Sequence, residues 1–137
     1  MLDTNVISEL FRPRPEPRVV AWLEALTGEV AITAVTLAEL LAGVRRLPEG
    51  RRKVLLSASI DAALQPYRDT RAVLPFDADA ADRYADVLLA REQAGLAIST
   101  ADAEIAAICL ARGAACATRN AKDFVATGVR LIDPWAA

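Results

Sequence analysis

The sequence predicts an α/β fold with a mostly parallel sheet, folded as one domain over residues 1–137. Short apolar segments alternate with segments of helical periodicity along the chain, an order that favours parallel strands joined by helices. No repeat, low-complexity tract or linker interrupts this order. A length of 137 residues and an apolar content of 54% suit a single buried core.

The first third of the chain predicts two strands and two helices. Residues 1–2 end a short apolar strand, and the polar turn 3–5 follows it. A helix over 6–11 stops at a proline-rich loop, because proline breaks a helix interior. Apolar spacing over 19–26 predicts the second helix. The β-branched run 30–35 is typical of a buried strand.

The middle of the chain predicts two more helices and a strand. A helix over 36–46 begins with the Thr-x-x-Glu pattern of a capping box, formed by Thr36 and Glu39. A further helix covers 54–64. The run 73–76 predicts a short strand, placed at an edge of the sheet or at a strand end because it contains a proline.

The last third predicts two helices and two strands. Asp77 or Asp79 caps a helix with an apolar face. A polar turn then opens the helix over 103–112, which a glycine ends. The runs 114–118 and 129–132 are short and apolar, and they predict the last two strands.

Composition excludes several classes of protein. The chain has no histidine, which removes Ser-His-Asp and Cys-His catalysis and every histidine-ligated zinc site. The net charge of −2 excludes an evenly basic nucleic-acid surface but not a local basic patch. Cys109 and Cys116 form no Cys-x-x-Cys motif and are expected as reduced core residues. No membrane span or export signal is visible, so we expect a cytoplasmic protein.

Acidic side chains fall where parallel strands end. Asp3 follows the first strand, Glu39 lies in the first turn of a helix after the second, and Asp102 opens a later helix. Asn120 and Asp123 follow the strand over 114–118. The carboxyl ends of parallel strands share one edge of the sheet, so these side chains are expected to converge. Oxygen ligands without histidine or thiolate suit a hard cation, Mg²⁺ or Mn²⁺.

Each of these residues also has a structural interpretation. Glu39 fits the capping-box partner of Thr36. Asp3, Asp102 and Asn120 fit N-caps or first-turn residues that the helix dipole favours. Only their joint placement indicates a site.

Seven segments resemble one family in order and spacing. They are residues 2–9, 19–23, 32–43, 74–77, 102–107, 117–124 and 129–135. The chain resembles PIN-domain ribonucleases, and more narrowly the VapC-type toxins of bacterial toxin–antitoxin pairs in their FitB-like branch. An aspartyl-phosphate phosphatase would need an Asp-x-Asp motif after the first strand, where this chain has Asn5.

The resemblance implies a three-layer fold with a five-stranded parallel sheet and a pocket that binds Mg²⁺ or Mn²⁺. It implies that Asp3 and Asp102 are metal ligands, with Glu39 as the third acid. Thr4 and Asn5 would orient Asp3 or a metal-bound water through hydrogen bonds.

The sequence departs from the family pattern at two places. The fourth acid of the family is often an aspartate where this chain has Asn120, and Asp123 is a candidate to replace it as a catalytic residue. Thr118 and Asn120 are expected to support the ligands through hydrogen bonds. In addition, only two residues precede Asp3, so either the first strand is very short or the true start lies upstream.

The resemblance also implies an activity and partners. The expected function is hydrolysis of RNA phosphodiester bonds by a toxin that forms a homodimer and binds a cognate antitoxin, with DNA contacted only through the antitoxin. The alternative is a catalytically weak PIN-domain partner of a DNA-binding antitoxin that acts in transcriptional regulation.

Three groups of arginines are candidates for RNA binding. The strongest cluster includes Arg45, Arg46, Arg51 and Arg52, which flank the helix that carries Glu39. Cations at helix ends also have a plain structural role. The arginines at 12, 14 and 18 in the proline-rich loop form a second group, and Arg119 is a third candidate.

Overall fold

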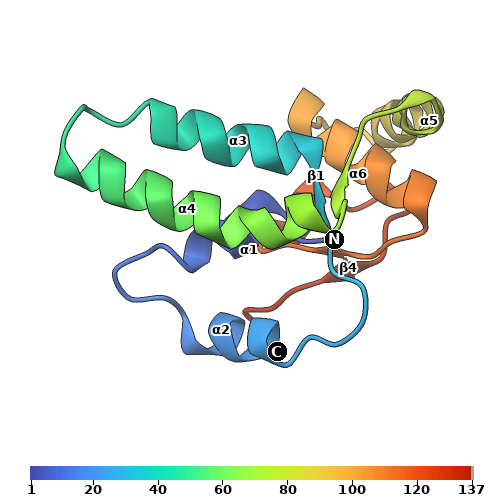
Figure 1. Cartoon of the computed structure of the whole chain (residues 1–137). Helices are drawn as coiled ribbons and strands as arrows, with labels where there is room; N and C mark the ends of the chain where they lie inside the picture. The colour runs from blue at the N-terminus through green and yellow to red at the C-terminus, as the bar shows by residue number, and fades with distance from the viewer. Residues whose placement is uncertain (137) are drawn as a thin grey trace.

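A computed structural model describes residues 1–136, and its strands are short and parallel (Figure 1). β1 (Ile32–Thr33) pairs with β2 (Val73–Leu74), and β3 (Cys116–Ala117) pairs with β4 (Leu131–Ile132). Leu2 lies between the two pairs. Its N–H donates to the carbonyl of Ala31 at 2.9 Å, and it forms a parallel bridge with Ala117.

The predicted α/β fold is confirmed, whereas the count of five strands is not. Five segments lie in hydrogen-bonded order, but the first consists of Leu2 alone and forms a single bridge. The other strands are also shorter than predicted, with two residues each. Of the predicted strand 30–35, for example, only β1 forms, because the helix α3 (Ala34–Arg45) begins directly after it.

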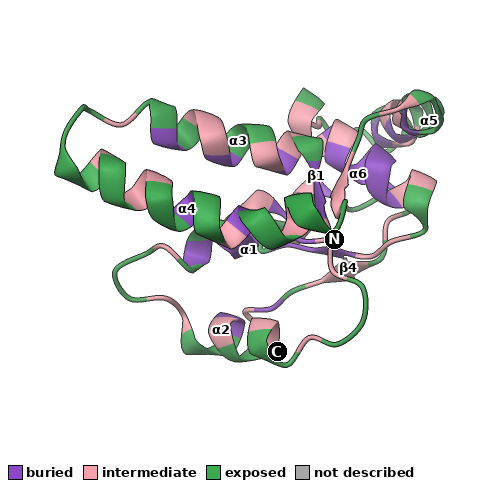
Figure 2. Cartoon of the chain, in the orientation of Figure 1, coloured by how far each residue is buried: buried purple, intermediate pink, exposed green. Residues whose placement is uncertain are grey.

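The sheet separates two hydrophobic clusters, which gives the three layers of the predicted fold. Consecutive residues of a strand point to opposite faces. Ala117 accordingly belongs to the cluster formed with Val6, Ile32 and Leu40. Cys116 belongs to the cluster around the helix α6 (Thr100–Arg112). Figure 2 shows the buried residues on the inner sides of the helices and exposed residues on their outer sides.

The helices surround the sheet unevenly (Figure 1). α3 (Ala34–Arg45) and α4 (Arg51–Asp69) form a long hairpin that projects to one side. α5 (Ala78–Gln93) and α6 (Thr100–Arg112) pack together on the other side. Two short α-helices come earlier in the chain. These are α1 (Thr4–Glu9) and α2 (Pro17–Glu24), the latter with proline at its first position, where no hydrogen bond is lost.

Most helix boundaries differ from prediction, and α4 in particular is longer than the predicted 54–64. At α3 the reason is that a different residue caps the helix. Thr33, not Thr36, is the N-cap of α3, and its Oγ1 accepts from the Thr36 N–H at 3.0 Å. The capping box of Thr36 and Glu39 is therefore wrong. Asp3 caps α1 and Ser99 caps α6, so both helices begin earlier than predicted. Asp77 is the cap of α5.

Two further expectations are confirmed, one for the end of α6 and one for the two cysteines. Gly113 ends α6 with a φ of 62°, a conformation that favours glycine. Cys109 and Cys116 are buried and form no disulfide. Over residues 1–136, none of the helices has both the length and the apolar character needed to cross a membrane.

Candidate active site

Asp3 is the buried centre of the site. It follows Leu2 at the carboxyl end of the sheet, and its side chain is 4% exposed. Its Oδ1 accepts from the Thr4 N–H at 2.8 Å, and its Oδ2 accepts from Thr118 Oγ1 at 2.8 Å and from Asn5 Nδ2 at 3.1 Å. Burial raises the pKa of this carboxyl, although the hydrogen bonds oppose the rise, and the charge of Glu39 raises it further.

Glu39 reaches the site from α3. Since Thr33 caps this helix, the carboxylate is not used as a cap, and Glu39 Oε1 instead accepts from Thr4 Oγ1 at 2.8 Å. The same hydroxyl lies 3.3 Å from Thr36 Oγ1. Thr4 therefore contacts both acids, through its N–H on Asp3 and its hydroxyl on Glu39.

Asp102 and Asp123 bring two further carboxylates. Asp102 lies in the first turn of α6, and its N–H donates to Ser99 Oγ at 3.1 Å. Burial raises the pKa of Asp102, and the negative charges of Asp3 and Asp123 raise it further. Asp123 is the last residue of the short helix η1 (Ala121–Asp123). The charge of Asp102 is thus repelled by Asp3, which lies 99 residues earlier in the chain, and by Asp123, which lies 21 residues later.

Polar residues after β3 hold Asp3 in place. Thr118 is fully buried, donates to Asp3 and accepts from the Asn120 N–H at 3.1 Å. Asn5 Oδ1 accepts from the Arg119 N–H at 3.1 Å. Thr118 and Asn5 both hydrogen-bond to Asp3, while their supporting role in catalysis stays a prediction. Asn120 contributes its main chain, while its side chain is exposed and forms no capping hydrogen bond.

The four carboxylates fit a hard cation that keeps some of its water ligands better than a cation that is fully enclosed by protein ligands. Within residues 1–136, no three His, Cys, Asp or Glu side chains lie close enough together to enclose a metal ion. Mg²⁺ commonly keeps several waters and takes only one or two carboxylates from the protein. Burial is the main reason that the pKa values of Asp3 and Asp102 are raised, and the charges of neighbouring acids raise them further. A bound cation would offset both effects, because it favours the charged carboxylates.

The strongest predicted basic cluster does not join the acids. Arg45, Arg46, Arg51 and Arg52 are exposed around the connection between α3 and α4. Figure 1 shows this connection at the end of the hairpin far from β1. Arg119, by contrast, is tied to Asn5 and lies at the site itself.

Sequence reasoning missed Arg91, a buried arginine of α5. Its side chain is 3% exposed and donates to the carbonyls of Lys122 and Val125, at 3.3 and 2.9 Å, and to that of Ala97. It therefore ties the segment before α6 to η1. The signal was available, because Arg91 follows the buried Val87 by one helical turn and falls on the apolar face.

Comparison with known proteins identifies the family. The PIN domain family matches residues 1–129. The chain belongs to the PIN domain family. The VapC ribonuclease Y4jK of Sinorhizobium fredii is 40% identical to this PIN domain over 136 residues, which are 98% of this chain and 96% of that protein.

Solved structures confirm the PIN fold. The crystal structure of FitAcB from Neisseria gonorrhoeae matches with a TM-score of 0.92 and 39% identity, over 99% of this chain and 98% of that one. The structure of VapBC2 from Rickettsia felis, bound to a DNA fragment from its promoter, matches with a TM-score of 0.79 and 26% identity, over 96% of each chain. This PIN domain is therefore similar to VapC and FitB proteins, as the motifs indicated.

We expect the Asp102→Asn variant of this PIN domain to be more heat-stable than the wild type at pH 7 without divalent cations, by a few degrees in Tm. The folded-state pKa of Asp102 is raised, so the wild type loses stability as pH rises from the unfolded pKa through the folded one. Asparagine does not titrate, and the advantage of the variant should vanish below pH 4. Thermal unfolding followed by circular dichroism measures both effects.

Asp79→Asn is the matched control, because Asp79 also lies in a first helical turn but is exposed. This variant should lose only the helix-dipole term, a few tenths of a kcal/mol, and melt slightly earlier. A Tm for Asp102→Asn that falls as much as that of Asp79→Asn would show that repulsion at Asp102 is negligible.

Proposed function

We propose that this PIN domain, residues 1–137 acting as one domain, hydrolyses RNA with a divalent cation and is the toxin of a toxin–antitoxin pair. The observation that carries the proposal is that acids from distant parts of the chain lie near enough for their charges to act on one another: Glu39 on Asp3, and Asp3 and Asp123 on Asp102. The similarity to a VapC ribonuclease supports RNA as the substrate.

Asp3, Asp102 and Glu39 are the proposed ligands of Mg²⁺ or Mn²⁺. When bound, such a cation lowers the pKa of a coordinated water and stabilises charge on the phosphate. Asp3 is held for this role by Thr118 and Asn5 on one oxygen and by the Thr4 N–H on the other.

The remaining polar residues position these acids. Thr4 donates to Glu39 and so fixes the carboxylate that reaches the site from α3. We assign Asp123 as the fourth acid, because its charge acts on Asp102 whereas the Asn120 side chain is exposed. Asn120 keeps a supporting role through its N–H on Thr118.

We also propose a homodimer that acts in the cytoplasm and is inhibited by a cognate antitoxin. The promoter-bound VapBC2 relative supports a link to DNA that runs through the antitoxin. A catalytically weak partner of the antitoxin is the second candidate, and the following experiment separates the two.

Purified protein incubated with a structured RNA should cleave it with Mg²⁺ or Mn²⁺ and stop when EDTA is added. Asp102→Asn should lower the cleavage rate by about 10²-fold or more, because it removes a charge that the cation needs. Gel electrophoresis of end-labelled RNA measures the rate. Equal cleavage with EDTA, or full activity of Asp102→Asn, would contradict the mechanism, and a complete absence of cleavage would favour the regulatory partner.

A further inference from the structure

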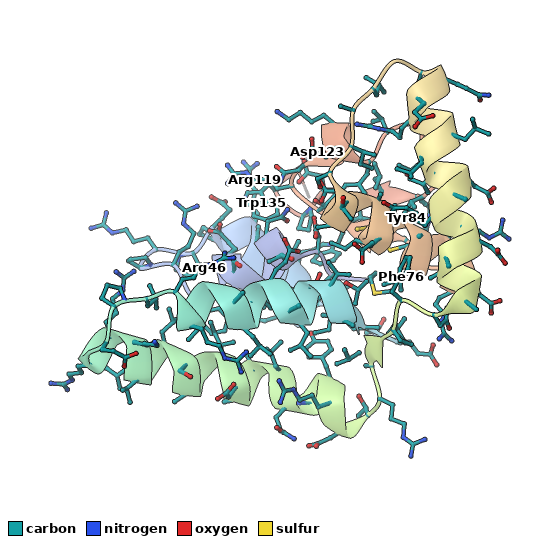
Figure 3. The ribbon with its side chains drawn as sticks, turned by 90° about the horizontal axis from the view of Figure 1, so that it is seen from above. Arg46, Phe76, Tyr84, Arg119, Asp123 and Trp135 are labelled. Carbon is teal, nitrogen blue, oxygen red and sulfur yellow. The ribbon has the colours of Figure 1, made fainter. Side chains whose placement is uncertain are left out.

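Arginines from two distant segments gather around Trp135 at the edge of the site. The guanidinium carbon of Arg119 lies 5.2 Å from the centroid of the Trp135 ring. Arg18, at the start of α2, donates from Nη1 to the Trp135 carbonyl at 3.3 Å. We call Arg18, Arg119 and Trp135 the Trp135 rim. Figure 3 shows Arg119 and Trp135 together in the same part of the view as Asp123.

A short chain of hydrogen bonds ties the Trp135 rim to Asp3. The Arg119 N–H donates to Asn5 Oδ1 at 3.1 Å, and Asn5 Nδ2 donates to Asp3 Oδ2 at 3.1 Å. These hydrogen bonds fix the main chain of Arg119 relative to Asp3, and the ring of Trp135 orients the guanidinium from there.

The charge of Arg119 also acts on Glu9, at the other end of α1 from Asp3. Glu9, the last residue of α1, has a lowered pKa because the Glu16 N–H and Arg12 donate to it and because the charges of Arg12 and Arg119 lie near. Arg12 and Glu9 form an ion pair at 3.2 Å. The two predicted groups of arginines, those of the proline-rich loop and Arg119, thus meet on one surface.

Arg119 is available to an anion. It is exposed, and within residues 1–136 it forms no ion pair with a carboxylate. The nearby carboxylates have other partners: Glu9 accepts from Arg12, and Asp133 Oδ1 accepts from the Trp135 N–H at 2.9 Å. Since the indole face supports the guanidinium, the planar group is held in a fixed position while its N–H donors remain free.

We propose that the Trp135 rim binds the backbone of RNA, with Arg119 on a phosphate next to the one at the acids and Trp135 as the residue that positions Arg119. This inference rests on the proposed function for its substrate. Trp135 acts on the arginine and does not stack on a base, because the guanidinium lies over its ring. The arginine cluster at the α3–α4 connection, where Arg46 lies in Figure 3, is apart from Arg119 and Trp135, so we assign the phosphate next to the acids to Arg119.

The test measures RNA binding without cleavage. A fluorescein-labelled, single-stranded RNA with 2′-O-methyl groups is titrated with full-length protein in EDTA, and fluorescence anisotropy gives Kd at several salt concentrations. Arg119→Ala should weaken binding about tenfold and reduce the slope of log Kd against log salt by about 0.7, the value for one phosphate contact on a single strand. Arg130→Ala, an exposed arginine next to β4, is the matched control and should leave Kd unchanged.

Variants of Trp135 separate positioning from folding. Trp135→Leu should weaken RNA binding by about threefold. Trp135→Phe should bind RNA nearly as well as the wild type, because phenylalanine keeps an aromatic face. The double variant Arg119→Ala/Trp135→Leu should bind RNA no worse than Arg119→Ala alone. A fully additive double variant would overturn the positioning role.

Two other results would overturn the inference. One is a wild-type Kd for Arg119→Ala, and the other is a larger loss for Arg46→Ala or Arg52→Ala than for Arg119→Ala. Since binding is measured in EDTA, the outcome is independent of the metal mechanism. If Arg119→Ala binds RNA more weakly than the wild type, and the wild type does not cleave RNA, the role of the Trp135 rim is supported and the proposed hydrolysis is contradicted.

Discussion

We expect Asp3→Asn to reduce the rate of RNA cleavage by about 10³-fold, the largest effect of any single substitution in this PIN domain. Asp3 is the only one of the four acids that is buried, and both its oxygens are held by hydrogen bonds. Asparagine keeps the shape but removes the charge and one of the two acceptor oxygens. The loss should lie in kcat, because the substitution removes the group that holds the cation and not a contact to the RNA.

Three measurements make this expectation specific. Asp61→Asn, on the exposed side of α4, should cleave RNA at the wild-type rate. Mn²⁺ binding followed by electron paramagnetic resonance should weaken in Asp3→Asn and not in Asp61→Asn. Circular dichroism should show that both variants fold. If Asp3→Asn folds, binds Mn²⁺ like the wild type and keeps more than a tenth of the activity, Asp3 is not the central ligand.

The positions of the acids could be predicted because parallel strands impose them. Any polar residue directly after Leu2 or close behind β1 and β3 arrives at one edge of the sheet. Asp3 and Thr118 therefore meet although they are 115 positions apart. Strand length did not follow from the same pattern. Two-residue strands carry too little of the apolar pattern to mark where a strand ends and a helix begins.

The partner of Glu39 could not be predicted because two caps competed for one helix. Thr33 and Thr36 are both threonines ahead of an apolar run, and the pattern Thr36 to Glu39 fits a capping box. The backbone of β1 places Thr33 Oγ1 on the Thr36 N–H, so α3 begins at Ala34, two residues earlier than predicted. This shift frees Glu39 for Thr4, so of the two predicted roles of Glu39 the capping box is wrong and the place near Asp3 remains.

The grouping of charges depended on packing that sequence spacing does not encode. Arg45 to Arg52 are close together in sequence and form the densest basic run, yet the α3–α4 hairpin carries them away from the sheet (Figure 1). Arg18 and Arg119 are 101 positions apart, and both contact Trp135. A dense run of charge is easy to recognise, whereas a surface assembled from distant segments requires the fold.

We expect Arg91→Met to lower the free energy of unfolding by about 3 kcal/mol. Hydrogen bonds from a charged donor contribute roughly 1.5–3 kcal/mol each, and the loss of all three is partly offset because methionine removes the cost of burying a charge. Arg91 is buried, and its donors reach the carbonyls of Lys122, Val125 and Ala97. Methionine fills part of the space but leaves these carbonyls unsatisfied. Urea unfolding monitored by circular dichroism measures the loss.

Two further variants show whether this loss belongs to the contacts of Arg91. Arg68→Met, an exposed arginine in the last turn of α4, should change stability by less than about 0.5 kcal/mol. Arg91→Lys should fall between the wild type and Arg91→Met, because an ammonium group cannot reach carbonyls on both segments in the fork geometry of a guanidinium. Hydrogen exchange should rise first in residues 95–99 and 121–125, the two segments that Arg91 joins. Uniform exchange across the chain, with Arg91→Met as stable as Arg68→Met, would mean that this buried cation does not hold the two segments together.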